Sequence, residues 1–335
     1  MGGLEAAIDA AAHQHGFSGV VRLDRGGAVE VARAYGEANR ALSVPNTLAT
    51  RFGIASGVKG LTALTVMSLV EDGVLALDTP ARALLGDDLP LVDDDVTVEH
   101  LLAHRSGIGD YLDEDADLDI TDHVLSVPVH RLAAPEDYLQ VLGGHPTTFV
   151  PGERFAYCNG GYVLLALLAE RAAGTAFHDL VTRRVCEPAG MTATAFLRSD
   201  ELPGDAALGY LHGDGLRTNV LHLPVRGSGD GGVYTTVADV HALWAALFAG
   251  RIVPPERVRQ MTAPVSDVPD EGRRYGLGFW LDAVGDAVIV EGYDAGVSFR
   301  SVNDPAAAVT WTVIANWSDG AWPMARRLRE LTAAG

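Results

Sequence analysis

Ser56 and Lys59, in the stretch FGIASGVKGL (52–61), are a pair whose types and spacing could do chemistry. Lys59 is the only lysine of the chain, and the other 24 of its 25 Lys plus Arg residues are arginine. An arginine guanidinium stays protonated, whereas burial can lower the pKa of a lysine until it accepts a proton. A spacing of three residues places both side chains on one helix face. The pair is compatible with a nucleophile beside its base, or with an N-cap serine and a surface lysine.

Tyr157 and Asn159 form a second polar pair, in PGERFAYCNGGYVLLALLAERAAG (151–174). They fall in a turn just before a strongly apolar helical run. A phenol can relay a proton, and an amide can hold Lys59 or a substrate carbonyl. Taken alone, the pair is more typical of a buried turn with an asparagine cap.

Local patterns predict how Ser56 is positioned. The apolar run RFGIA predicts a strand that leads Ser56 to the first turn of a helix, which continues to about Gly73. Free backbone N–H groups and the helix dipole at that turn favour negative charge on a reacting oxygen.

The remaining elements predict an α/β fold of the α+β type. A helix over 3–15 and a hairpin over 19–39 precede a mainly helical middle. From about Tyr275 four antiparallel strands follow, YGLGFWLDAV, DAVIVEGY, VSFRSVND and AVTWTVIAN, and a helix ends the chain. This order predicts an antiparallel sheet flanked by helices and built from both termini, with a helical region inserted in it. We expect one unit, 1–335, with a sheet region of about 1–58 and 225–335 and a helical region of about 59–224. The acidic run Asp110–Asp122 is typical of a solvated loop.

Composition excludes several classes of function. A net charge of −19 disfavours nucleic-acid and anionic-membrane partners, which call for basic patches. The sequence has no run of 18 apolar residues, so it predicts no membrane span. No signal peptide is recognisable, and the two cysteines fit a reducing compartment, so we expect a cytoplasmic protein. A trimmed form of a secreted protein would look the same.

Three motifs in fixed order resemble the serine β-lactamase and penicillin-binding-protein superfamily: SGVK, LLAHRSGI and PGERFAYCNGGYVLL. The likeness is strongest to its branch of class C β-lactamases, DD-peptidases and family VIII esterases. Later landmarks match as well, so the resemblance covers most of the chain: EDGVLALD (71–78), CEPAGM (186–191) and GDGGVYTTVADV (229–240). It implies the β-lactamase-like version of the fold described above.

The resemblance also implies the roles of the site residues. Ser56 would form an acyl-enzyme, and Lys59 and Tyr157 would share the proton transfers. Asn159 would steady Lys59 and the substrate amide or carbonyl. His104 would pack behind the site, and neither a metal nor an organic cofactor would be needed.

The third family motif departs from the pattern. Relatives carry Lys-Thr-Gly, or His or Trp in the first place, where the best register here gives Glu291, Gly292 and Tyr293. The resemblance implies that these residues line the substrate site, with the N–H groups of Ser56 and Asp294 as the oxyanion hole. The cation that would bind a substrate carboxylate is missing from the first position of this motif. Glu291, which stands there, is expected to repel a substrate carboxylate.

We therefore expect a serine hydrolase that acts on a small ester or amide without a free carboxylate. One alternative is a β-lactamase or D-amino-acid peptidase whose cation is Arg300 or Arg226. Another is a catalytically silent binding or sensor domain on the same scaffold. The oligomeric state is left open by the sequence.

Overall fold

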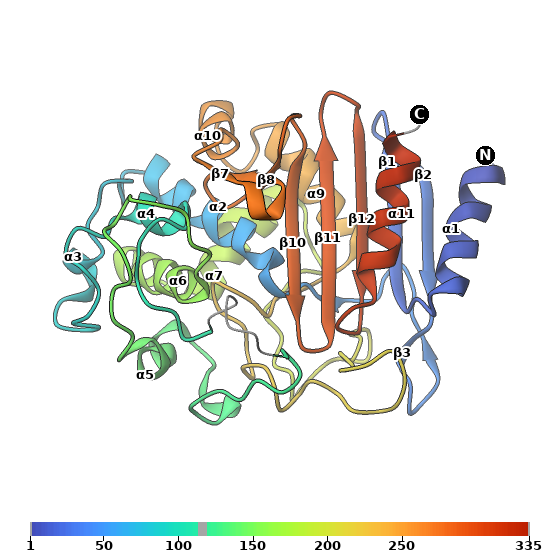
Figure 1. Cartoon of the computed structure of the whole chain (residues 1–335), viewed down its shortest axis with the longest axis horizontal. Helices are drawn as coiled ribbons and strands as arrows, with labels where there is room; N and C mark the ends of the chain where they lie inside the picture. The colour runs from blue at the N-terminus through green and yellow to red at the C-terminus, as the bar shows by residue number, and fades with distance from the viewer. Residues whose placement is uncertain (1, 113–118, 334–335) are drawn as a thin grey trace.

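The computed structural model of the chain describes residues 2–112 and 119–333. Its largest element is an eight-stranded antiparallel sheet in the order β2-β1-β12-β11-β10-β9-β8-β7 (Figure 1). The strands come from the two ends of the chain: β1 (Gly19–Arg25), β2 (Ala28–Tyr35), β7 (Ser266–Val268), β8 (Arg273–Tyr275), β9 (Trp280–Asp282), β10 (Val288–Asp294), β11 (Val297–Asp304) and β12 (Val309–Ala315).

The two ends join where β1 pairs with β12. Their register runs antiparallel from Gly19 opposite Ala315 to Arg25 opposite Val309. The β-branched and aromatic residues of VTWTVIA suit a central strand that is buried on both faces. The expected sheet built from both termini is therefore confirmed.

Helices cover both faces of this sheet (Figure 1). On one face α1 (Gly2–Gln14) and α11 (Ala321–Ala333) enclose a core with side chains of β1, β11 and β12. On the other face α2 (Val58–Glu71) and α9 (Val237–Phe248) belong to a larger core that extends into the helical region.

Among the described residues between α2 and α9 the regular elements are helices, as expected, apart from the two-residue strand β6 (Tyr234–Thr235), and long loops join them. The helices of this region are α3 (Arg82–Leu85), α4 (Val98–Leu102), α5 (Leu139–Leu142), α6 (Asn159–Ala173), α7 (Phe177–Val181) and α8 (Glu187–Ala189). A π-helical segment η4 (Thr182–Cys186) and 3₁₀ turns η2 (Val129–Arg131) and η3 (Pro135–Tyr138) complete it. Beyond α9 lie α10 (Pro255–Met261) and a 3₁₀ turn η5 (Pro269–Glu271), so the C-terminal segment is not purely sheet.

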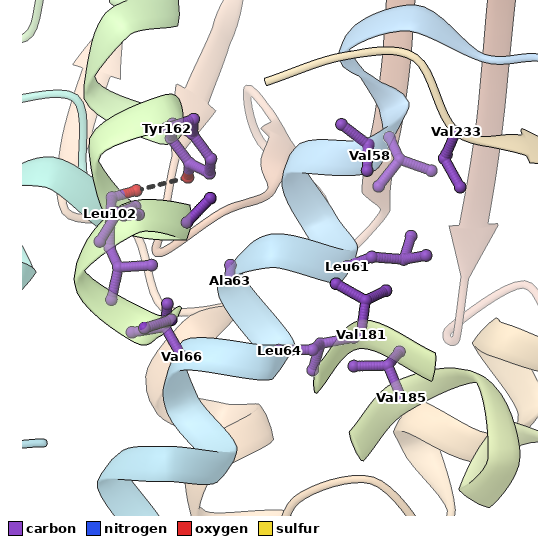
Figure 2. Close-up of a cluster of buried hydrophobic side chains, with 14 of the residues drawn as sticks. Val58, Leu61, Ala63, Leu64, Val66, Leu102, Tyr162, Val181, Val185 and Val233 are labelled. Carbon is purple, nitrogen blue, oxygen red and sulfur yellow. Dashed lines mark hydrogen bonds between the residues drawn. The ribbon is translucent and has the colours of Figure 1, made fainter. Parts of the chain in front are cut away.

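Helix α2 is buried on every side, because residues from Val58 to Leu69 all lie in the core. Figure 2 shows α6 packed on one side of it and α7 with η4 on the other. A helix that is apolar all round requires this position. The N-terminal end of α2 is therefore held rigidly between the sheet and the helical region.

A short pair of strands sets the direction in which the chain enters α2. Strand β5 (Phe52–Gly53) pairs with β6 (Tyr234–Thr235), and a second small sheet joins β3 (Glu37–Asn39) to β4 (Val44–Pro45). After β5, Ala55 has a left-handed φ of 45° and starts the 3₁₀ turn η1 (Ala55–Gly57). Such a backbone conformation costs free energy in a non-glycine residue and is kept where the surroundings enforce it. The turn presents Ser56 at the junction of sheet and helices.

One local expectation was wrong and another holds only in part. YGLGFWLDAV was expected as one strand, but the chain turns between β8 and β9, where Gly278 has a φ of 90°. In the described part of the acidic run the chain is a loop, as expected, and Asp119 and Asp122 are exposed, but Asp110 is half-buried against α6. Residues 113–118 of that run lie outside the described residues. No helix among those described is long and apolar enough to cross a membrane.

Candidate active site

Ser56 and Lys59 lie side by side, as their spacing indicated. Lys59 Nζ donates to Ser56 Oγ over 2.8 Å, and also to Asn159 Oδ1 over 2.8 Å and to the backbone oxygen of Asp230 over 2.9 Å. The lysine side chain is buried, with 3% of the residue exposed. A three-donor ammonium thus meets three fixed acceptors, one of which is the hydroxyl oxygen.

Tyr157 and Asn159 reach the same point from the start of α6. Cys158 caps this helix, because its Sγ accepts from the N–H of Gly161, and the cap holds Asn159 at the first helical position. The ring of Tyr157 lies with its centroid 4.9 Å from Lys59 Nζ. The structure therefore brings Ser56, Lys59, Tyr157 and Asn159 together from two helices about 100 residues apart in the chain.

His104 lies behind Tyr157. It is buried, with its ring centroid 4.3 Å from that of Tyr157, and its Nδ1 accepts the N–H of Cys158. Burial, and to a lesser degree the charge of Lys59, holds the pKa of His104 well below its usual value. A neutral imidazole here supports the Tyr157–Asn159 turn without adding charge.

Three consecutive residues that sequence reasoning missed hold two of the three acceptors of Lys59 described above, Asn159 and Asp230. The Asp110 carboxylate accepts the N–H groups of Asn159 (2.5 Å) and Gly160 (2.8 Å). Tyr111 donates to Asp230 Oδ2 over 2.5 Å, and Leu112 accepts from Asn159 Nδ2 over 3.3 Å. Residues 110–112 therefore connect the Asn159 and Asp230 segments, two of the three segments that accept from Lys59.

Asp110 also places a carboxylate at the positive end of the α6 dipole. Burial raises its pKa to about 6, assisted by the charge of Asp230 and opposed by the hydrogen bonds from Gly160, Asn159 and Leu112. The acid is therefore ionised above about pH 6. It loses its charge, and part of its acceptor capacity, as the pH falls through that value.

We expect Asp110→Asn to lower kcat/KM at pH 7.5 by roughly tenfold to a hundredfold, the usual worth of charge-assisted hydrogen bonds. In the native protein kcat/KM should fall as the pH drops through about 6, and the variant should lack that contribution. The measurement is a pH profile of kcat/KM for both proteins. The matched control is Asp122→Asn, an exposed acid of the same segment. An unchanged rate and pH profile in Asp110→Asn would show that this carboxylate does not position Asn159.

Glu291 does not present a bare negative charge. It lies between Arg273, whose Nη1 is 3.0 Å from its Oε1, and Arg300, whose Nε contacts its Oε2. Burial alone would raise the pKa of Glu291, but the two arginines hold it below the usual range. The expectation that Glu291 repels a substrate carboxylate is therefore wrong, because two cations compensate it.

Arg300 and Arg226, the two arginines considered above as the cation for a substrate carboxylate, do not face the site. Arg300 is engaged by Glu291, and Arg226 donates its Nε–H to the backbone oxygen of Phe196. Neither residue lines the two cavities that meet at Ser56.

Gly292 lies against the backbone of the Ser56 turn. A Cβ at this position would come within 2.0 Å of the oxygen of Ile54 and 2.8 Å of the nitrogen of Ser56. Only glycine allows this approach of β10 to η1. The expected neighbours Tyr293 and Asp294 follow at the end of β10, and the strand thus lies beside Ser56.

Two cavities meet at Ser56. One, of about 220 Å³, is mostly apolar, and Asn159, Asp230 and Asp294 are among the residues that line it. The other, of about 540 Å³, is more polar and is lined by Tyr157, Trp280 and Glu291. Within the described parts of the chain, no cluster of three or more His, Cys, Asp or Glu side chains could hold a metal ion.

Comparison with known proteins assigns the chain to a family. The sequence model of the family described as Beta-lactamase matches residues 4–335. Esterase EstB of Burkholderia gladioli is 32% identical over 213 residues, which cover 59% of this chain and 52% of that protein. A D-aminopeptidase of Brucella anthropi is 30% identical over 277 residues, covering 81% and 50%. This chain thus spans about half the length of these two relatives.

A solved structure agrees with this assignment. The crystal structure of the penicillin binding protein from Bacillus halodurans has a TM-score of 0.91 and 35% sequence identity, covering 97% of this chain and 99% of that one. Over nearly its whole length, the chain therefore belongs to the Beta-lactamase family of serine hydrolases.

Proposed function

We propose that this protein is a serine hydrolase that forms an acyl-enzyme on Ser56 and acts on small esters or amides. The observation that carries the proposal is the 2.8 Å contact between Lys59 Nζ and Ser56 Oγ, at a hydroxyl that opens on two cavities. A nucleophile within hydrogen-bond reach of its base, with the base oriented by a third group, is the arrangement that covalent catalysis needs. Here Asn159 and the backbone of Asp230 orient Lys59.

The proton moves between three groups in this mechanism. Unprotonated Lys59, with Tyr157 beside it, takes the proton of Ser56 as its oxygen bonds the substrate carbonyl carbon. The same groups return the proton to the leaving alcohol or amine when the carbonyl carbon releases it. A water molecule then attacks the carbonyl carbon of the ester on Ser56 and gives a proton to the same groups. The bond from that carbon to Ser56 Oγ breaks, Oγ takes the proton back, and the acid leaves.

The negative oxygen that forms during each step needs two N–H donors. The N–H of Ser56 is one. The approach of Gly292 to η1 supports a register in which Gly292 is the glycine that ends the family triplet. In that register the second donor is the N–H of Tyr293, one residue before the Asp294 N–H that the sequence-based register favours.

A second candidate function is supported by Arg154. This arginine lines the polar cavity beside Tyr157 and could receive the carboxylate of a penicillin or of a D-amino-acid peptide. Three carboxylates, Asp267, Asp270 and Glu271, line the same cavity and weaken that attraction. Neutral esters and amides therefore remain the first proposal.

The test is an intact-mass measurement after mixing the protein with neutral esters, amides, penicillins and D-amino-acid peptides. We expect an added acyl mass from the neutral substrates, and none on Ser56→Ala under the same conditions. An adduct from penicillins or peptides alone would favour the second candidate. A protein that binds these compounds yet never gains mass would be a silent binding domain.

A further inference from the structure

The 220 Å³ cavity and the polar cavity open on different sides of Ser56. The Tyr157–Asn159 turn divides the two cavities: Asn159 lines the apolar cavity, and Tyr157 lines the polar one. In acyl transfer the leaving group must lie beside the groups that return its proton. In the mechanism above these are Lys59 and Tyr157, and Tyr157 lines the polar cavity. The acyl group then lies on the opposite side, in the apolar cavity.

The lining of this cavity is mostly apolar, and its polar groups include those of His123, Ser199, Asn219 and His222. Aliphatic side chains of three separate loops and the rings of Tyr138 and Tyr234 form its wall; the aliphatic residues are Leu112, Ile120, Leu125, Leu197, Leu223, Pro224 and Val225. Concave apolar walls with few polar groups are typical of pockets that bury a ligand's hydrophobic part.

The charges around the cavity disfavour an anionic occupant. Asp230 and Asp294 line it, and none of the described lining residues is lysine or arginine. The histidines His123 and His222 also line it, and burial lowers the pKa of His123, which favours its neutral form. Asp230 is already bonded to Tyr111, and Asp294 Oδ1 accepts the N–H of Ala295. An acyl group with a carboxylate would therefore meet like charges in a largely dry space.

The volume limits the size of the occupant. A dry protein cavity of about 150 Å³ holds benzene, so 220 Å³ accommodates a phenyl ring with a few methylene groups, or a chain of roughly eight carbons. Resting on the proposed hydrolysis, we infer that this cavity is the acyl pocket and that it selects apolar acyl groups of this size that carry no carboxylate.

The experiment compares kcat/KM for one leaving group with acetyl, butanoyl, hexanoyl, 3-phenylpropanoyl and monosuccinyl esters. Burial of each added methylene should raise kcat/KM roughly fourfold from acetyl to hexanoyl, since these chains are shorter than the roughly eight carbons that the cavity accommodates. The 3-phenylpropanoyl ester should exceed the monosuccinyl ester. A flat series, or a preference for the monosuccinyl ester, would overturn the inference.

A filling variant tests the location. Leu197→Trp should reduce the ratio of hexanoyl to acetyl kcat/KM to about one, because the indole occupies the cavity. The matched control is Val284→Trp, at a side chain that is 92% exposed and remote from this lining. A native ratio in Leu197→Trp would place the acyl group elsewhere.

Two further measurements distinguish failure of the acyl-pocket inference from failure of the proposed hydrolase function. An acetyl adduct on Ser56 combined with a flat ester series would overturn the pocket while the hydrolase proposal stands. If no ester acylates the protein, binding of hexanamide and acetamide to Ser56→Ala still decides the pocket. Tighter binding of hexanamide that Leu197→Trp removes would support it, and equal binding would overturn it.

Discussion

Lys59→Arg is expected to lower kcat/KM by about a hundredfold or more while the fold stays intact. Lys59 is 3% exposed and has Ser56 Oγ as one of its three acceptors. An arginine keeps the positive charge, so it can still hold Asn159, but it cannot accept the proton of Ser56 at any working pH. The substitution therefore separates charge from basicity, which removal of the side chain would not do.

The measurement is kcat/KM for a neutral ester, alongside circular dichroism and the melting temperature of both proteins. The control is Arg327→Lys on α11. It exchanges the same two residue types in the opposite direction, at an exposed position far from the site. Turnover within a few fold of the native rate in Lys59→Arg would remove Lys59 from the role of base. A large loss of helical signal would attribute the effect to folding.

Elements with a long, clean pattern could be predicted from the sequence. The apolar run of α6, the alternating and β-branched strands β10 to β12, and the amphipathic α11 carry their signal within themselves. Short elements depend on tertiary contacts and were missed or merged. Strand β7 has three residues and exists because β8 pairs with it, and α4 ends early, before the left-handed turn at His104.

The same distinction applies to the site. Ser56, Lys59, Tyr157 and Asn159 could be named in advance because each lies in a local motif with a recognisable neighbourhood. Asp110 could not, because its acidic neighbours indicate a solvated loop and its partners lie about 50 residues away. Asp230 contributes a backbone oxygen to Lys59, and a backbone oxygen leaves no trace in residue type.

Glu291 shows why a charge cannot be interpreted from one strand. Its compensation comes from Arg300 on the neighbouring strand β11 and from Arg273 on β8. Both contacts follow from the pairing of strands, which sequence patterns do not fix at the level of one residue. The expected preference for uncharged substrates now depends on the carboxylates beside the apolar cavity.

Tyr157→Phe is expected to lower kcat by roughly a hundredfold at every pH, with little change in melting temperature. The ring is held by its neighbours and not only by its hydroxyl: it stacks on Trp280 at 6.0 Å and lies 4.3 Å from the ring of His104. Phenylalanine keeps these contacts and removes only the group that would relay the proton. The loss should therefore appear in the chemical step.

Tyr162→Phe is the matched control, because it removes a hydroxyl that serves structure. Tyr162 donates to the backbone oxygen of Leu102 over 2.8 Å, inside the core (Figure 2). Its loss should cost about 1 kcal/mol in the free energy of unfolding and leave kcat nearly unchanged. The two variants differ in which quantity changes: rate without stability for Tyr157, stability without rate for Tyr162. If Tyr157→Phe instead loses stability and retains its rate, Tyr157 is a packing residue and Lys59 transfers the proton without it.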